Sequence, residues 1–487
     1  MDVRDAELER LKGACAEVET ALTAPSEIAE AGRDWWPLAM LWALQGEPPS
    51  LPSVIARPGD AAEVSAVLAI CNEARIPVTP AAGRSGVCGS SIPLFGGVSL
   101  DLCGLRGITE VDEKSMLFRA LPGTFGPDLE GELSAEHCLT LGHWPQSMEL
   151  STLGGWLACR SAGQYSTRYG KIEDMVASLE VVLASGRTIT TGSGGPRSAT
   201  GPDLTQLFVG SEGTLGVITG AWMRAHPCPP ARRSAAFSCA SFADGLEISR
   251  RILRAGATPA VLRLYDAMES ERVFSVRGAC VMIVLDEAQP EVLDATMSIV
   301  DSECTAGGAS PLDDSLVDHW LSTRNDVSAL GDLVTAGVVV DTVEIAGRWS
   351  VLSSIYAECI DALSQLEGVL ACSAHESHAY TDGACVYFTF AGMQPGGSSA
   401  GIGASQVRWS EQFYLDAWQA IMDVTIRHGG AISHHHGIGL NRARFLSDGI
   451  GRALEVLEAL KLAMDPNGIL NPGKLGLRSS FGEFTWP

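Results

Sequence analysis

Several sequence patterns that identify common protein functions are absent from this chain. It contains no CxxC pair, no GxGxxG turn between a strand and a helix, and no GxxxxGKS/T loop. No apolar run approaches the roughly twenty residues that cross a bilayer, and the charged, amphipathic N-terminus lacks the apolar core of a signal peptide. We therefore expect no zinc ribbon, no Rossmann or P-loop nucleotide site and no membrane span.

Positive charge is also scarce, with 34 basic against 58 acidic side chains and a net charge of -24. Such a field repels phosphate backbones and anionic lipid surfaces, so nucleic acid is not expected as a partner. The 13 cysteines are scattered and odd in number. This pattern argues against a disulfide framework and favours a reducing, cytoplasmic location.

A length of 487 residues predicts more than one domain. Residues 5–24 are predicted to be helical, and short strands and helices joined by glycine turns then alternate, with Gly59 and Asp60 at the start of one helix. The predicted fold class is α+β. The predicted parts are an N-terminal helical segment at 1–47, a first domain at 48–226, a second at 227–425 and a closing segment at 426–487.

Three glycine-rich segments lie within residues 80–219, namely PAAGRSGVCGS, STLGGWLACRSAG and VGSEGTLGVIT. Each by itself is more often a simple tight turn. Glycine also lets backbone N–H groups approach a pyrophosphate closely. The order and spacing of the three segments favour a cofactor that lies extended across one domain.

Seven segments occur in an order that resembles a known family. They are PAAGRSG, GHWPQSMELSTLGGWLACRSAGQYSTRYGKIED, GPDLTQLFVGSEGTLGVIT, RLYD, DGACVYFTF, SHHHGIG and DPNGILNPGK. Together they are similar to the FAD-linked oxidases of the vanillyl-alcohol-oxidase (PCMH) type, and most similar among these to the alkylglycerone-phosphate synthases. Two of the segments, GSEGTLGVIT and DPNGILNPGK, are shared with D-lactate and glycolate dehydrogenases. The resemblance implies a two-part FAD-binding domain, an α/β cap domain with the substrate site, and a C-terminal segment that closes the active site.

The resemblance also implies which residues contact FAD. They are Pro80, Ala81, Ala82, Gly83, Arg84, Ser85, Gly86, Gln146, Ser147, Met148, Glu149, Leu150, Ser151, Thr152, Cys159, Arg160, Ser161, Ala162, Glu212, Gly213, Thr214, Leu215, Gly216, Val217 and Ile218. Arg84 departs from the family, which usually has glycine there; it could pair with the pyrophosphate or point to solvent. The first loop has no histidine to carry a covalent flavin, so we expect FAD to be bound non-covalently.

The strand GACVYFTF alternates, with Val386, Phe388 and Phe390 on one face and Tyr387 on the other. Cross-strand packing is the ordinary role of such a tyrosine. The resemblance implies instead that Tyr387 is the catalytic proton-transferring residue. An ordinary tyrosine has a pKa of about 10, so basic neighbours would have to lower the pKa of Tyr387 before it could act as a base.

His434, His435 and His436 allow three interpretations: a metal site, a structural kink, or an active-site wall for protons and an anion. On an extended stretch His434 and His436 would face one way and His435 the other, and no acidic residue lies beside them at ligand spacing. We therefore expect no metal. The resemblance implies that the three histidines are catalytic, next to FAD.

Three arginines complete the candidate site through the resemblance. Arg263 matches an active-site arginine, Arg324 matches a substrate-binding arginine across a gap, and Arg442 remains near the histidines. Each would otherwise be an ordinary surface group. Leu440 stands where the synthases have a lysine, which argues against a glycerone phosphate or long-chain substrate.

Two enzyme functions and one non-enzyme function are open. The first is a synthase-like substitution on a small anionic substrate through flavin N5, with Tyr387 removing a proton. The second is oxidation of a 2-hydroxy acid or related alcohol, in which arginines hold the carboxylate and a histidine takes the hydroxyl proton. The third, a flavoprotein scaffold without turnover, is disfavoured by the intact tyrosine and histidines. The oligomeric state stays open, with a homodimer as one alternative.

Overall fold

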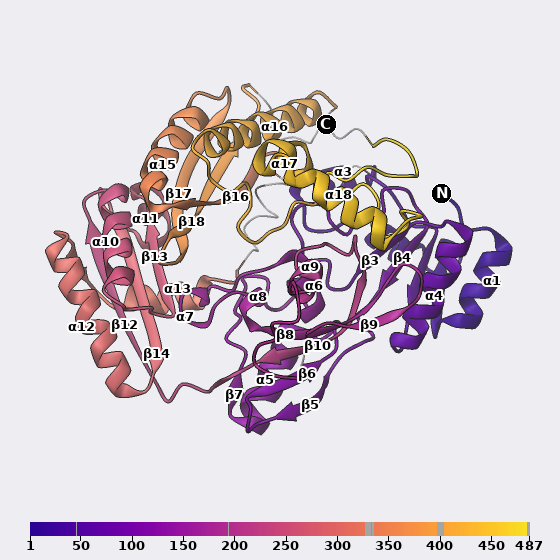
Figure 1. The fold of residues 1–487 in the computed structure, drawn as a ribbon. Helices are drawn as coiled ribbons and strands as arrows, with labels where there is room; N and C mark the ends of the chain where they lie inside the picture. The colour runs from indigo at the N-terminus through magenta and orange to yellow at the C-terminus, as the bar shows by residue number, and fades with distance from the viewer. Residues whose placement is uncertain (45, 193, 327–332, 334–335, 397–403, 485–487) are drawn as a thin grey trace. The chain divides into compact units, whose positions relative to one another are not determined.

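The computed structural model describes residues 1–487 except 45, 193, 327–332, 334–335, 397–403 and 485–487. The chain forms two compact units, each assembled from separate stretches of sequence. The first unit comprises 1–162, 171–228 and 435–487; the second comprises 163–170 and 229–434 (Figure 1). The predicted α+β class is confirmed. No helix in the described ranges has the length and apolarity that a membrane span needs.

The first unit contains two main sheets, in agreement with the predicted two-part architecture. The four-stranded sheet has the order β1 (Glu17–Thr20), β2 (Val54–Arg57), β4 (Val98–Asp101), β3 (Val78–Ala81). The five-stranded sheet has the order β5 (Ile108–Asp112), β6 (Leu117–Ala120), β10 (Val217–Arg224), β8 (Val176–Val182), β9 (Thr188–Thr190). A small pair joins β11 (His226–Pro227) to β7 (Leu139–Thr140).

Short helices connect these strands. They are α1 (Asp5–Ala14), α2 (Pro25–Glu30), α3 (Pro37–Leu44), α4 (Ala61–Ala74), α5 (Gly126–His137), α6 (Leu153–Cys159), α8 (Ile172–Met175), α9 (Thr205–Phe208), α17 (Ala443–Ile450) and α18 (Ala453–Met464). As predicted, α4 starts directly after Asp60, whose carboxylate caps the helix by accepting from the amide of Glu63 at 2.8 Å. One face of α4 packs on β2, β4 and β3 and forms their hydrophobic core.

The predicted helix at residues 5–24 is wrong in its second half. The helix ends at Ala14, and Glu17–Thr20 pairs antiparallel with β2 as an edge strand. Cys15, at the end of α1, already has extended backbone angles. For the stretch EVET, pairing with the existing strand β2 outweighs its helix propensity.

The second unit contains one seven-stranded sheet. Its order is β15 (Ser310–Leu312), β12 (Ala231–Cys239), β14 (Cys280–Ala288), β13 (Val261–Tyr265), β17 (Val369–Ala379), β18 (Gly383–Gly392), β16 (Val339–Arg348). Its helices are α7 (Ser166–Tyr169), α10 (Phe242–Arg254), α11 (Ala267–Phe274), α12 (Pro290–Ala306), α13 (Ser315–Thr323), α15 (Trp349–Ser364) and α16 (Ala404–Arg427).

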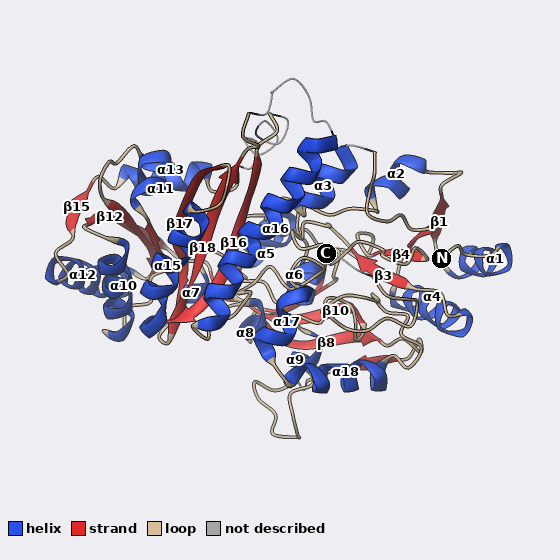
Figure 2. Ribbon diagram, turned by 90° about the horizontal axis from the view of Figure 1, so that it is seen from above, coloured by secondary structure: helices blue, strands red, loops and turns tan. Residues whose placement is uncertain are grey.

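The two faces of this sheet carry different helices. Figure 2 shows α10, α12 and α15 along one side of the strands and α11 and α13 along the other. The face towards α10 is apolar: Leu264 points at Gly245 of α10, where an added Cβ would come within 2.4 Å of Leu264 Cδ1. The alternate residues of β13, Arg263 and Tyr265, lie on the opposite face, where Arg263 contacts Trp320 of α13. The sheet therefore displays its polar residues on the α11 and α13 side.

Candidate active site

The segments predicted to contact FAD meet in the first unit. A Cβ on Gly83 would come within 2.2 Å of the backbone oxygen of Leu150, and a Cβ on Gly213 within 3.0 Å of Pro80. At Gly83 a side chain would force two backbones apart, and at Gly213 the backbone angle φ of +72° favours glycine. The first loop, the middle segment and the 212–218 loop thus form one backbone surface.

Three non-glycine residues of this surface adopt left-handed backbone angles. They are Arg84 (φ 48°), Arg160 (φ 58°) and Glu212 (φ 49°). A position that requires positive φ explains why the family usually has glycine at the site of Arg84. The Arg84 guanidinium donates to Ser99 Oγ at 3.0 Å and lies 3.6 Å from an Asp101 oxygen. It therefore contacts Ser99 and Asp101, and its pairing with the pyrophosphate stays a prediction.

The first loop has the donors that a dinucleotide needs. Among the described residues, the backbone N–H groups of Gly83 to Gly86 donate to no protein acceptor. These amides are partly exposed rather than buried. Clustered backbone donors beside closely packed glycines are the chemistry that holds a pyrophosphate. The residues present fit an extended FAD.

A residue that sequence analysis missed supports this surface from behind. His143 is fully buried, its Nε2 lies 2.8 Å from the Oγ of Ser161, and its ring packs on Trp156 at 4.7 Å. Burial lowers the pKa of His143 to about 3, so the ring is neutral. His143 therefore fixes the hydroxyl of Ser161, one of the predicted flavin contacts. No sequence pattern distinguished this histidine from an ordinary core residue.

The second half of SHHHGIG docks on the predicted flavin loop at 212–218. The Glu212 carboxylate accepts from the amides of Ile438 at 2.6 Å and Gly439 at 2.9 Å. A Cβ on Gly437 would come within 2.5 Å of Glu212 Oε1. Burial raises the pKa of Glu212 to about 7, against these hydrogen bonds and the attraction of Lys474.

The C-terminal motif DPNGILNPGK fastens the same loop. Lys461 donates to the carbonyls of Thr214 at 2.8 Å and Leu470 at 2.6 Å, and Asn471 Nδ2 donates to the carbonyl of Glu212 at 2.6 Å. The buried Lys474 ammonium donates to the carbonyl of Ile92. Burial lowers the pKa of Lys474 to about 7, although Asp34 and Glu212 oppose the shift.

The structure places Arg442 inside the first unit. Its side chain is fully buried and donates to the carbonyl of Gly437 at 2.8 Å and to Cys88 Sγ at 3.7 Å. Leu440 is buried beside Gly89. Arg442 therefore stabilises the turn after the histidines, and its predicted contact with substrate stays a prediction.

A row of four paired residues crosses the polar face of the second unit's sheet. Tyr265 of β13 faces His375 of β17, His375 faces Tyr387 of β18, and Tyr387 faces Glu344 of β16. The His375 ring stacks on Tyr387 with centroids 4.8 Å apart and on Tyr265 at 5.4 Å. The predicted alternation of GACVYFTF is confirmed, because Phe388 and Phe390 are fully buried while Tyr387 is only partly buried.

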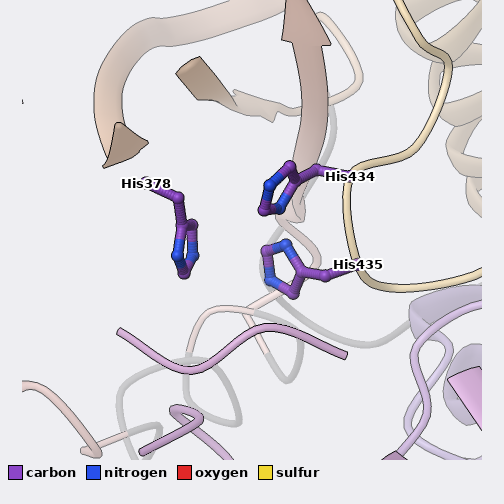
Figure 3. Close-up of side chains that lie close together, drawn as sticks. All are labelled: His378, His434 and His435. Carbon is purple, nitrogen blue, oxygen red and sulfur yellow. The ribbon is translucent and has the colours of Figure 1, made fainter. Parts of the chain in front are cut away.

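Glu344 connects this row to the start of the histidine run. Its carboxylate accepts from the Ser433 hydroxyl at 3.1 Å and from the amide of His434 at 3.3 Å. The His434 ring stacks on His378 at 5.0 Å and on Tyr380 at 5.6 Å. Figure 3 draws His378 and His434 together with His435, which follows His434 directly in the chain.

The expected extended geometry of the histidine run is wrong. Residues 434–436 form consecutive bends, so their side chains do not alternate between two sides as in a strand. His435 and His436 instead contact each other, with ring centroids 4.4 Å apart. The glycines on both sides leave the backbone free to bend here.

Two of the predicted arginines flank one indole ring. The guanidinium carbons of Arg263 and Arg324 each lie 5.4 Å from the centroid of Trp320. Arg324 also stacks over Tyr165 at 5.2 Å and donates to Gln164 Oε1 at 3.2 Å. The structure thus brings together two arginines that are 61 positions apart, both supported by a flat aromatic surface.

The comparisons with known proteins agree with this geometry. Residues 228–475 match the family model described as FAD linked oxidases, C-terminal domain, and residues 52–192 match the FAD binding domain. The FAD-linked oxidoreductase YgcU of Escherichia coli K12 is 31% identical over 87% of this chain and 89% of its own length.

Two further relatives have names that describe an activity. The alkyldihydroxyacetonephosphate synthase of Dictyostelium discoideum is 29% identical over 88% of this chain and 74% of its own length. The glycolate oxidase subunit GlcD of Bacillus subtilis is 27% identical over 88% and 89%. A solved alkyldihydroxyacetonephosphate synthase superposes with a TM-score of 0.79 at 25% identity, covering 97% of this chain and 86% of that one.

Proposed function

Because this chain belongs to the FAD-linked oxidase family and takes FAD as its cofactor, we propose that it is a flavoenzyme acting on a small anionic organic substrate. In this proposal Arg263 and Arg324 bind the carboxylate or phosphate of the substrate, and Tyr387 transfers a proton. The histidines 434–436 form a wall of the active site next to FAD. The reaction class is that of the synthases, in which FAD supplies the electrophilic N5.

The burial and the hydrogen-bond partners of Arg263 are the main support for the proposal. Its side chain is 6% exposed, and among the described residues its guanidinium donates only to neutral groups, the Tyr265 hydroxyl at 3.0 Å and Ser377 Oγ at 2.8 Å. A buried cation without a carboxylate at salt-bridge distance is unfavourable unless an anion joins it. An anionic substrate supplies that charge, and the fork of the guanidinium suits carboxylate and phosphate equally.

Tyr387 is the group best placed for proton transfer by this proposal. It is held by the stacked ring of His375 on β17, and Glu344 is its register partner on β16. These contacts leave the ring little freedom, which keeps the phenol hydroxyl in one position. A fixed hydroxyl next to a bound anion is what a proton donor or acceptor requires.

Oxidation of a 2-hydroxy acid is the second candidate function. It is favoured by Leu440, a buried apolar residue packed against Gly89 at the position where the synthases have a lysine. Without that cation the site loses a partner for the second charge of a phosphate. A singly charged carboxylate needs fewer cationic partners than a doubly charged phosphate does.

Anaerobic mixing distinguishes the two reactions. The purified protein is mixed with a panel of 2-hydroxy acids, including glycolate and D-lactate, and separately with acyl glycerone phosphate plus a long-chain alcohol, while the flavin absorbance is followed. Bleaching that lasts until an electron acceptor is added indicates net oxidation. Turnover without lasting bleaching indicates a redox-neutral substitution. A protein inert towards both groups contradicts the proposal.

Tyr387→Phe tests the assignment of the proton-transferring residue. The change removes one hydroxyl and keeps the ring stack on His375, so the flavin content is expected to stay normal. Turnover should fall by roughly 10²–10⁴-fold, the usual effect of losing a general acid or base. Thr389→Val, two residues along the same face, is the matched control and should keep near-normal activity. Normal turnover of Tyr387→Phe would remove Tyr387 from the mechanism.

A further inference from the structure

His375 is held on both faces by tyrosine rings. Tyr265 and Tyr387 occupy the two neighbouring strands directly opposite it, and the planes of His375 and Tyr387 differ by only 15°. The side chain of His375 is 12% exposed, so the row is not sealed inside the sheet. The imidazole therefore has a fixed orientation beside the tyrosine that the proposed function places at the substrate.

The carboxylate of Glu269 holds the ring from one edge. Glu269 Oε2 lies 3.1 Å from Nδ1 of His375, and its other oxygen accepts from Arg272 at 2.7 Å. The pKa of Glu269 is lowered: burial alone would raise it, but the hydrogen bond with His375 and the attraction of Arg272 and Arg263 outweigh burial. An ionised carboxylate can only accept. The proton of neutral His375 is therefore on Nδ1, and Nε2 carries a lone pair.

The surrounding charges keep His375 neutral at physiological pH. Burial lowers the pKa of His375, and Arg263 on β13 and Arg272 on α11 lower it further, against the opposing effect of Glu269. Tyr265 and Tyr387 are the other titratable groups that face the ring. The result is a neutral imidazole next to a phenol. Two adjacent groups with such different proton affinities are suited to act as base and acid.

We propose that His375 is the catalytic base, that Glu269 is its positioning residue, and that Tyr387 acts beside it as the acid or hydrogen-bond donor. For a 2-hydroxy acid, the hydroxyl O–H bond breaks as its proton moves to Nε2 of His375. Bound FAD would supply the two-electron acceptor for the hydride of the same carbon as the carbonyl forms. This inference rests on the second candidate function proposed above, oxidation of a 2-hydroxy acid, and assigns its base to a histidine outside the 434–436 run.

The first test needs no substrate. The wild-type protein with isotope-labelled histidine is titrated by NMR, and the His375 signal is identified by its absence in His375→Phe. We expect an Nδ1–H tautomer with a pKa below the ordinary 6.5. Glu269→Gln should lower that pKa further, by about one unit, and Arg272→Gln should raise it by less, because Arg272 is largely exposed. An Nε2–H tautomer, or a pKa that does not respond to Glu269→Gln, would overturn the dyad.

The second test measures the rate of turnover against pH, with the compound that bleaches the flavin as substrate. It follows the acid limb of this profile, which is the fall in rate at low pH. The limb should be lost in His375→Phe, which keeps an aromatic ring in the stack, and should move to lower pH in Glu269→Gln. It should survive in the residual activity of Tyr387→Phe. If Tyr387→Phe is impaired but the limb persists in His375→Phe, the base assignment is wrong and the proposed function stands. If Tyr387→Phe is fully active, the proposed function itself is wrong, independently of the result for His375→Phe.

Discussion

Glu376 is expected to make the stability of the second unit fall as the pH rises. The residue lies in β17, opposite Leu264 and Val386 on the apolar face, and is fully buried. Among the described residues, neither of its carboxylate oxygens has a hydrogen-bond partner. Burial raises the pKa of Glu376 from 4.5 to about 8, although the attraction of Arg263 opposes the shift.

The sign follows from proton binding in the two states. In the unfolded chain the carboxyl of Glu376 loses its proton above pH 4.5, whereas in the folded protein it keeps the proton up to about pH 8. Between these values the folded state binds more protons, so raising the pH favours unfolding. At about 1.4 kcal/mol per pH unit, the free energy of unfolding decreases by roughly 4 to 5 kcal/mol across the window.

Glu376→Gln removes this dependence while conserving the size of the side chain. We expect the variant to gain stability over the wild type at pH 8 but not at pH 5, with a melting-temperature difference that grows by several degrees between the two. Glu291→Gln, an exposed change on α12 that alters the net charge equally, is the control. An equal difference at both pH values would show that Glu376 is not protonated in the folded protein.

Two further predictions concern the cofactor and metals. Acid precipitation should release FAD into the supernatant, because the loop PAAGRSG has no histidine for a covalent bond; colour that stays with the pellet would contradict this. Chelators should leave turnover unchanged, because no acidic residue lies beside the histidine run at ligand spacing in the sequence. Activity lost with a chelator and restored by a divalent metal would identify these histidines as ligands.

The meeting of the glycine-rich segments was largely predictable because its signal is local. Gly83 is needed where two backbones approach closely and Gly213 where φ is positive beside the Pro80 ring, and such requirements are visible as glycines in the sequence. The strand face on which Tyr387 lies could also be predicted, because the alternation of side chains along one strand does not depend on the neighbouring strands.

The Glu269–His375 pair could not be predicted in the same way. It depends on the register of β13 and β17, which pairs residues more than a hundred positions apart. A shift of one residue in β17 would turn His375 to the apolar face. His143 was missed for a related reason, because its burial next to Ser161 is a property of the packed core.

The divided composition of the first unit has a consequence for synthesis on the ribosome. Its last stretch, 435–487, is translated only after the whole of 229–434, a delay of roughly 10 to 40 s at 5–20 residues per second. Until then the 212–218 loop lacks the bonds from Lys461, Asn471 and the 438–439 amides. The second unit can therefore fold first, and the 212–218 loop, a predicted FAD contact, gains these bonds only at the end of synthesis.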